Sequence, residues 1–329
     1  KGYYPDQGWQ VMEILAPAGS PEGLVAAVKG GCDAVYLGGE AFGARASAKN
    51  FTDGELEGAI GYCHSRGVRV HVTVNTLIKN SEMRDAVSYV RFLADIGADA
   101  VIVQDLGLLS NIQGLPFEIH ASTQMGIHSP EGLEWCAEHG ISRAILSREL
   151  TLEELGRIVP NSPIDVEVFV QGAMCYGFSG GCLMSSLIGG RSGNRGACAQ
   201  PCRKRYVSES DSGYLISNAD MFCVDYLDRL DALGVKSVKI EGRMRSPAYA
   251  YLASKTYSLA NRNERGPEYK EALALLKTVF NRGFCDGYLA GTDGLVHPKY
   301  PDNRGMWLGK AAAVGRKIDF SGLGVNPGD

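Results

Sequence analysis

Four cysteines in one glycine-rich stretch are the residues of this sequence best suited to chemistry. They are Cys175, Cys182, Cys198 and Cys202, spaced C-x6-C-x15-C-x3-C within residues 172–206. The stretch has eight glycines, five basic residues and no Asp or Glu. Positive surroundings and backbone N–H groups stabilise thiolate ligands, and a glycine-rich stretch without acids offers both. Residues 172–206, called the cysteine loop below, are predicted to bind a metal ion or a metal cluster.

Three chemistries compete for the four thiols. Disulfides are disfavoured because nine cysteines are an odd number, no signal peptide is visible and a chain of 329 residues needs no cross-links. Zinc sites usually pair cysteines about two to four residues apart, and only Cys198 and Cys202 fit. A 4Fe–4S cluster suits wide, uneven spacing and close N–H donors, so we favour it, with zinc as the alternative. Cys223 is a fifth candidate, but apolar neighbours at helical spacing indicate a buried core cysteine.

The composition is that of a soluble globular protein. Hydrophobic residues make up 45% and charged residues 21%, and the net charge is −4. No apolar run reaches the roughly 18 residues of a membrane helix and no targeting segment is visible, so we expect a cytoplasmic protein without a membrane partner. RNA remains a possible partner because binding follows the local field, and the cysteine loop carries a local charge of +5. A solvated basic face would give the same pattern.

Eight short β-branched segments alternate with amphipathic helical segments at a period of about 30 residues. The strands are expected at residues 13–19, 33–39, 68–76, 98–105, 117–124, 143–150, 165–172 and 236–243. This alternation predicts an α/β fold with a parallel sheet, and the count of eight favours a closed TIM-like (β/α)8 barrel. A doubly wound open sheet is the alternative, but no G-x-G-x-x-G follows the first strand.

The chain divides into two predicted parts. Residues 1–265 form the barrel, with the cysteine loop inserted between strands seven and eight. Residues 266–329 contain a helical segment at 271–284 and the start of a small β domain that we expect the chain not to complete. Because function gathers at the C-terminal ends of barrel strands, the cysteine loop is predicted to lie at the barrel mouth.

Charged residues directly after three other strands are predicted to share that mouth. The candidate catalytic residues are Arg45, Arg148, Glu241 and Arg243. Arginines on three different loops could hold the two carboxylates of a small dianion by paired hydrogen bonds. The alternative is that each arginine pairs with a nearby carboxylate, Glu40, Glu149 or Glu241, as scaffolding of the rim.

Substrate contacts are predicted from basic, amide and aromatic residues near the same mouth. The candidates are Asn75, Gln124, Tyr176, Arg191, Arg195 and Arg203. Arginines would hold phosphates, and Tyr176 with Phe178 would stack on an unpaired base, although aromatic packing on the rim is the commoner use. His71 is expected to be a satisfied core residue, whereas His120 fits a site or the core equally. H-E-x-x-H does not occur, and no Cys–His pair stands in a recognisable nucleophile setting, which argues against a hydrolase.

Several phrases resemble the peptidase U32 family, also called collagenase-like peptidases, over roughly residues 12–312. They include EILAPAGSPEG, HASTQM, GCLMSSLIGGRSGNRGACAQPCR and VKIEGRMRSPAYA. The resemblance implies an oxygen-independent hydroxylase of a ribosomal RNA cytidine, a tRNA uridine or a ubiquinone precursor. It also implies a 4Fe–4S cluster on the same four cysteines and prephenate as the oxygen donor. The phrases SGNRGACAQPCR and PDNRGMWLGK are most similar to the ribosomal RNA branch.

The sequence departs from the family pattern in two respects. Gln171 stands where members often have His, so no role of that His transfers. The ribosomal RNA branch is usually longer, with a C-terminal domain that we expect to be missing here. Two other functions remain open: a metal-dependent peptidase, and an RNA-associated module in which the cluster is only structural.

Overall fold

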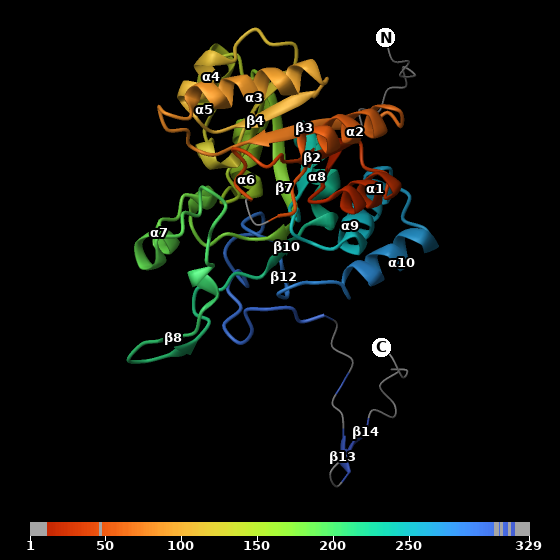
Figure 1. The fold of residues 1–329 in the computed structure, drawn as a ribbon. Helices are drawn as coiled ribbons and strands as arrows, with labels where there is room; N and C mark the ends of the chain where they lie inside the picture. Colours follow the sequence, from red (N-terminus) through yellow and green to blue (C-terminus); the bar gives the residue numbers. More distant parts are fainter. Residues whose placement is uncertain (1–11, 46–47, 306–308, 310–311, 315–316, 320–329) are drawn as a thin grey trace.

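Eight parallel strands form the centre of the molecule (Figure 1). The structure is a computed structural model and describes residues 12–45, 48–305, 309, 312–314 and 317–319. The strands are β1 (Glu13–Pro17), β2 (Ala34–Leu37), β3 (Arg69–Val74), β4 (Ala100–Val103), β5 (Glu118–Ala121), β6 (Arg143–Ile145), β7 (Asp165–Ala173) and β11 (Ser237–Ile240). They pair in chain order from β1 to β7, and β11 pairs with both β1 and β7. That double pairing closes the sheet and confirms the predicted (β/α)8 barrel.

Helices connect the barrel strands and cover the outside of the sheet (Figure 1). They are α1 (Pro21–Lys29), α2 (Asp53–His64), α3 (Met83–Asp95), α4 (Leu106–Asn111), α5 (Pro130–Glu138), α6 (Leu152–Ile158), α8 (Leu227–Leu233) and α9 (Pro247–Asn261). Local sequence sets their starts. Ser20, Ser129 and Ser246 each precede a Pro and accept a hydrogen bond from a first-turn N–H. Thr52 and Thr151 begin α2 and α6 with capping boxes.

The barrel interior holds charged side chains where such barrels usually hold branched apolar ones. Arg143 Nη1 donates to Glu13 Oε1 at 2.6 Å, and Lys239 Nζ donates to Glu167 Oε1 at 2.9 Å. Ser237 Oγ also donates to Glu13 Oε1, at 3.0 Å. All five side chains are buried. Because buried charges are tolerated only when paired, these bonds fix the inward registers of β1, β6, β7 and β11.

The cysteine loop leaves the barrel on an extension of β7 and returns beside it. β10 (Asp220–Phe222) runs antiparallel to the last residues of β7, and β12 (Phe284–Cys285) adds a parallel pair to β10. Between β7 and β10 lie the short helix α7 (Met184–Gly189) and the two-residue strands β8 (Tyr206–Val207) and β9 (Ser212–Gly213). The segment that contains the cysteine loop is therefore fixed at both ends, by β7 and β10, to one sheet edge next to the barrel.

Two local expectations need correction. The helical segment predicted at 271–284 is shorter and begins earlier, as α10 (Pro267–Leu276), and its predicted end forms β12. The helix does not continue to Asn281, whose side-chain Nδ2 donates to the carbonyls of Lys277 and Val279 in place of a helical N–H. Cys223 is buried, as expected, but it follows strand β10 and precedes a 3-10 turn rather than lying in a helix.

The C-terminal part packs on the barrel as far as residue 305. Helix α10 contacts α9, and β12 joins the barrel sheet through β10. Further on, β13 (Ala312–Val314) and β14 (Lys317–Asp319) form an antiparallel pair. The predicted boundary at 265 stays a prediction. Residues 1–11 of the predicted barrel domain and part of the phrase PDNRGMWLGK lie outside the described residues.

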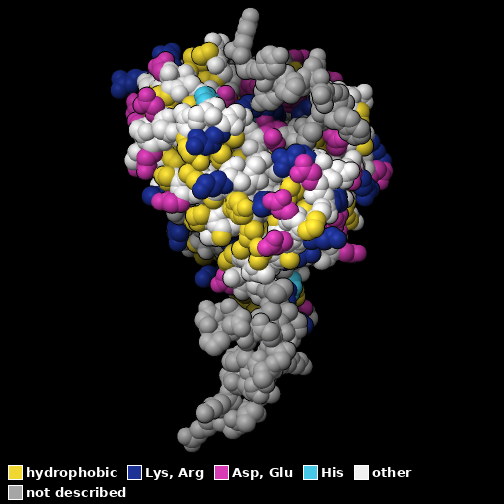
Figure 2. Space-filling view, turned by 90° about the vertical axis from the view of Figure 1, so that its right-hand side faces the viewer, with side chains coloured by type: hydrophobic (Ala, Val, Ile, Leu, Met, Phe, Trp, Pro, Cys, Tyr) yellow, Lys and Arg dark blue, Asp and Glu magenta, His cyan; other side chains and the backbone are white. Residues whose placement is uncertain are grey.

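The side of the molecule over α1, α9 and α10 mixes both charge signs. Figure 2 shows Lys and Arg side chains interspersed there with Asp and Glu. The cysteine loop, marked by α7 and β8, lies on the other side of Figure 1. Within the described residues, no helix is long and apolar enough to cross a membrane.

Gly19→Ala is expected to destabilise the fold. Gly19 follows β1, and a Cβ there would overlap the carbonyl oxygen of Arg243. The backbone must shift to make room, at a cost of about 1–3 kcal/mol in the free energy of unfolding. Gly58→Ala is the matched control, because this exposed glycine within α2 has nothing within 4 Å of a new Cβ. In urea unfolding, Gly58→Ala should be more stable than the wild type by about 0.5–1 kcal/mol. Equal stability of Gly19→Ala and Gly58→Ala would refute the contact at Gly19.

Candidate active site

Hydrogen bonds from distant parts of the chain hold the cysteine loop over the barrel mouth. Asn194 Nδ2 donates to Gln104 Oε1 at 2.6 Å, and Asn194 Oδ1 accepts from the Leu77 N–H at 2.9 Å. Glu149 accepts from the N–H and the hydroxyl of Ser179, at 2.8 and 3.0 Å. Gln104, Leu77 and Glu149 follow strands β4, β3 and β6. The loop is thus attached to three strand ends at the mouth, where its position after β7 predicted it.

Two arginines of the loop brace its structure. Arg195 makes a two-pronged ion pair with Glu82, with distances of 3.0 and 2.7 Å. Arg203 donates to Ser217 Oγ at 2.8 Å, to the carbonyl of Asn218, and to the carbonyl of Met174 at 2.9 Å. Arg203 therefore ties the outgoing and returning ends of the loop together. Since these donors are already in use, both side chains act first as positioning residues, and their predicted phosphate contacts remain predictions.

The four candidate ligands carry free thiols. All nine cysteines of the chain are free, so none of the candidates is in a disulfide. Cys198 is exposed, and Cys175, Cys182 and Cys202 are partly buried. Burial raises the pKa of Cys202; Arg203 opposes this, whereas negative charge on the other three thiols raises it further. The other three sulfurs are therefore close enough to Cys202 to act on it electrostatically.

Backbone features of the loop suit thiolate ligands. The Gln200 N–H donates to Cys198 Sγ at 3.3 Å, the kind of contact that stabilises a cluster thiolate. Gly177 lies against Cys182, since a Cβ at position 177 would be 2.6 Å from the Cys182 Cβ. Only glycine permits this approach of the first two ligand segments.

A separate group of potential metal ligands lies outside the cysteine loop. The ligand atoms of His71, His120 and Glu167 all lie within 4.8 Å of one another. Imidazole nitrogens and carboxylate oxygens are common ligands of divalent metal ions.

Three arginines surround one carboxylate beside the cysteine loop. Arg45 Nη2 donates to Glu241 Oε1 at 3.2 Å. Burial acts to raise the pKa of Glu241, but the charges of Arg45, Arg148 and Arg243 outweigh it and the pKa is lowered. Burial and the neighbouring charge of Arg45 lower the pKa of Arg243 to about 10. The candidate catalytic residues are thus brought together, and the ion pair of Arg45 with Glu241 is of the kind that the scaffolding alternative expects.

Arg148 and Arg243 keep most of their hydrogen-bonding capacity. Arg148 Nη1 donates to the Ala173 carbonyl at 2.8 Å, and its guanidinium lies 4.9 Å from the centre of the Phe169 ring. Arg243 Nη1 donates to Thr73 Oγ1 at 2.7 Å. A guanidinium has five N–H donors, so within the described part of the chain each retains several for a ligand.

The candidate substrate residues lie in two groups. Asn75 Nδ2 donates to Gln124 Oε1 at 2.8 Å, so these two amides are neighbours at the ends of β3 and β5. Tyr176 and Phe178 are each 52% exposed, which leaves a ring face available for stacking. Arg191 is exposed and donates from Nε to the Ala197 carbonyl at 2.9 Å.

The sequence profile of peptidase family U32 matches residues 19–297. The chain belongs to peptidase family U32. Among relatives within and around this family, the protein named "Collagenase" of Porphyromonas gingivalis is 35% identical over 85% of this chain and 73% of its own length. The Bacillus subtilis "tRNA hydroxylation protein P1" is 31% identical over 95% of this chain and 77% of its own length. The Escherichia coli "23S rRNA 5-hydroxycytidine C2501 synthase" is 36% identical over 72% of this chain but only 37% of its own length.

In this U32 protein, the residues that attach the loop were missed by sequence reasoning. Asn194 and Asn218 were not singled out, although Asn194 lies within the quoted phrase SGNRGACAQPCR. Asn218 Nδ2 donates to the Cys175 carbonyl at 3.1 Å. The only signal was the amide of Asn194 within the basic, acid-free stretch, because Asn218 lies beyond it, and the partners of both are set by the closed barrel. Neither could have been paired from spacing alone.

The stabilising effect of Glu241 should disappear in acid. Its pKa is lower in the folded chain than the ordinary value of 4.5, so its charge stabilises the fold above about pH 5. As the pH falls through the lowered value, the carboxylate takes up a proton and that contribution is lost. The difference in free energy of unfolding between wild type and Glu241→Gln should therefore be constant from pH 7 to 5 and shrink below pH 4. A difference that grows in acid would contradict the lowered pKa.

Proposed function

We propose that this chain hydroxylates a base of RNA, with a ribosomal RNA cytidine as the first target to test. The observation that carries the proposal is the placement of four free thiols and three arginines at one barrel mouth. Relatives whose names describe hydroxylation of tRNA and of 23S rRNA support the same class of substrate. The relative named for tRNA hydroxylation matches this chain over more of its own length than the 23S rRNA relative does. A tRNA uridine is therefore tested as the second target.

Cys175, Cys182, Cys198 and Cys202 would hold a 4Fe–4S cluster, which supplies one-electron chemistry when bound. Their free thiols, the N–H donor on Cys198 and their wide, uneven spacing along the sequence fit such a group. The loop's own contacts keep the ligands at the mouth, because Asn194 and Ser179 attach it to three strand ends. Zinc is the alternative occupant.

The arginines would bind the oxygen donor, a small dianion such as prephenate. Arg45, Arg148 and Arg243 contribute three positive charges and Glu241 one negative charge, which leaves +2 for the ligand. That charge matches two carboxylates, and the free N–H groups of Arg148 and Arg243 can pair with them. Arg45 also lies near enough to Cys175 for the thiolate charge to raise its pKa, although Glu241 has the larger effect. Donor and cluster sites are therefore adjacent.

RNA would approach from the cysteine-loop side. Lys204 and Arg205 are exposed near Arg191 in sequence and offer phosphate contacts. Tyr176 and Phe178 present half-exposed rings on which an unstacked base can rest. Asn75 and Gln124 offer amide groups for its edge. The base would be oriented so that one ring C–H faces the mouth.

A metal-dependent peptidase is the second candidate, favoured by the relative named "Collagenase". It would need a metal site that a peptide can reach and an open coordination position. The His71, His120 and Glu167 group is fully buried inside the barrel, where no peptide has access. Proteolysis that survives replacement of the four cysteines would favour this candidate.

Mass spectrometry of nucleosides tests the proposed function. Ribosomal RNA and tRNA from cells with and without the gene would be digested and compared. We expect one hydroxylated nucleoside, 16 Da heavier than its parent, to be lost without the gene and restored by the wild-type chain but not by Cys182→Ser. Identical nucleosides in both strains would reject RNA hydroxylation, and a change confined to quinones would reassign the substrate.

A further inference from the structure

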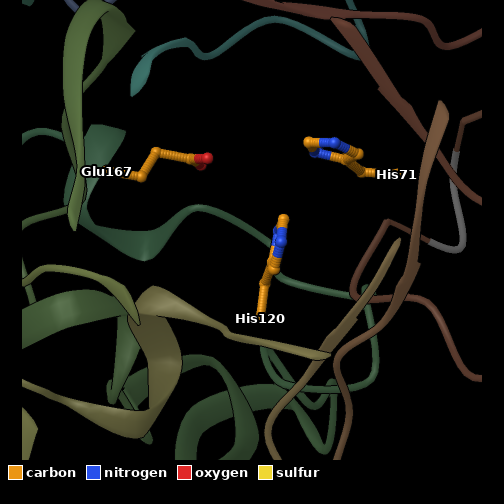
Figure 3. Close-up of side chains that lie close together, drawn as sticks. All are labelled: His71, His120 and Glu167. Carbon is orange, nitrogen blue, oxygen red and sulfur yellow. The ribbon is translucent and has the colours of Figure 1, made fainter. Parts of the chain in front are cut away.

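A second group of potential ligands lies inside the barrel, away from the cysteine loop. His71, His120 and Glu167 belong to β3, β5 and β7, which are alternate strands and contribute to one layer of the interior. Their ligand atoms lie within 4.8 Å of one another, and all three side chains have no exposed surface. Figure 3 shows both rings and the carboxylate pointing toward one common space.

Several polar atoms that face this space have no hydrogen-bond partner in the described part of the chain. They are both ring nitrogens of His71, Nδ1 of His120 and Oε2 of Glu167. Each such buried atom costs about 1–3 kcal/mol when it is left unpaired. Native proteins leave only a few such atoms unpaired per roughly 100 residues, so four in one place indicate a bound species that contacts one atom of each of the three residues. The expectation of a satisfied core histidine at position 71 is therefore wrong in that respect, although His71 is buried.

The surroundings orient these atoms as ligands. His120 Nε2 is 2.8 Å from Glu118 Oε2, which leaves Nδ1 as the nitrogen that faces the space. A carboxylate on the far nitrogen of a metal-bound histidine is a recurrent arrangement, since it fixes the tautomer and raises the basicity of the ligand. Glu167 Oε1 accepts from Lys239 Nζ at 2.9 Å, whereas Oε2 makes no hydrogen bond and has the Arg143 guanidinium 3.5 Å away. The rings of His71 and His120 meet edge to face, with centres 4.8 Å apart.

We propose that His71, His120 and Glu167 bind one divalent transition-metal ion, with zinc as the best match, at a centre separate from the cysteine loop. Two imidazole nitrogens and one carboxylate oxygen are a donor set that zinc and ferrous iron accept. Because all three side chains have no exposed surface, the ion has a structural role: it ties β3, β5 and β7 together beneath the mouth. A water molecule is the competing occupant, and it would satisfy the same atoms without selectivity.

The other end of the barrel offers a route of entry. A cavity of about 470 Å³ opens there, lined in part by Glu13, Arg69 and Arg143. Arg143 Nη1 lies 3.5 Å from Glu167 Oε2, so the cavity reaches the proposed site through this side chain. An ion entering here passes three carboxylates, since Asp165 and Asp231 also line the cavity. Movement of Arg143 would admit the ion, and its return would enclose it.

Zinc retention in the full chain, with the four loop cysteines replaced by serine, tests the proposal. These replacements remove every thiol ligand of the loop, so bound zinc reports on the interior alone. After treatment with a chelator, incubation with zinc and desalting, we expect about one zinc per chain and a raised melting temperature. Failure of this folded chain to retain zinc, as water occupancy would require, overturns the proposal.

Variants then locate the ion. Glu167→Gln is expected to weaken zinc binding at least 10-fold, and Glu118→Gln, which removes the carboxylate that orients His120 and also pairs with Arg69, about 10- to 100-fold. His128→Gln is the matched control because His128 is exposed on a loop, and its affinity should equal that of the parent. If Glu167→Gln does not fold by circular dichroism, Glu118→Gln decides alone, since Glu118 is 44% exposed. Unchanged zinc affinity in Glu118→Gln would then contradict the site.

Discussion

Cys175→Ser should abolish RNA hydroxylation and lose the cluster, with activity falling by at least about 10³-fold, because the cofactor carries the chemistry. Cys175 begins the cysteine loop at the end of β7, and its carbonyl accepts from Asn218 Nδ2 at 3.1 Å. That backbone contact does not depend on the side chain, so serine leaves the loop in place. The measurement is iron content and nucleoside formation for the purified variant, alongside circular dichroism to confirm the fold.

Cys223→Ala is the matched control for that experiment. Cys223 is also a free thiol near the returning end of the loop, but it is buried and donates from Sγ to the Asp286 carbonyl at 3.4 Å. Burial raises its pKa well above the ordinary value, which disfavours the thiolate that a metal needs. We expect full iron content and activity. If Cys223→Ala loses iron while Cys175→Ser retains it, Cys223 rather than Cys175 is a ligand. That result would contradict the proposed ligand set.

Arg243→Met should reduce hydroxylation by about 10²–10³-fold without lowering stability, because it removes one of the donors aimed at the proposed dianion. Arg243 is only 4% exposed, and its burial costs free energy, as its lowered pKa shows. Its loss leaves no buried partner unpaired, since Thr73 Oγ1 also donates to the Leu37 carbonyl at 3.0 Å and Glu241 keeps Arg45. Replacing a buried charge by an apolar chain of similar length is often neutral or stabilising.

This separation of activity from stability distinguishes a ligand-binding arginine from scaffolding. Arg157→Met is the control, because Arg157 pairs with Glu153 on the exposed face of α6. It should leave both properties unchanged. The measurements are donor-dependent hydroxylation rates and urea unfolding. If Arg243→Met unfolds more easily and keeps its rate, the arginines only support the rim and the dianion proposal is wrong.

The barrel could be predicted because its signals are local. Ser–Pro pairs and T-x-x-E boxes mark helix starts at Ser20, Ser129 and Thr52, and β-branched runs mark the strands. The cysteine loop follows strand seven along the chain, so its place at the mouth followed from the strand order alone. The strands β10 and β12 were not predicted, because two or three residues carry no periodicity.

Contacts between distant segments were beyond the reach of spacing. The partners Asn194 and Gln104 are 90 residues apart, and Arg195 meets Glu82 across 113. The sequence shows a basic loop, but in the structure Arg195 donates hydrogen bonds to the carboxylate of Glu82. Grouping His71 with Glu167 likewise needs the register of a closed sheet. Strand order alone does not supply that register.

The content of iron and sulfide in the chain after anaerobic reconstitution is the most direct test of the central claim. If the four thiols of the cysteine loop hold a 4Fe–4S cluster, each chain should contain about four iron and four sulfide ions, with broad absorbance near 400 nm from thiolate-to-iron charge transfer. Replacing Cys175, Cys182, Cys198 and Cys202 by serine should remove all of it. Absence of sulfide, with one zinc bound to these four cysteines instead, would contradict the account.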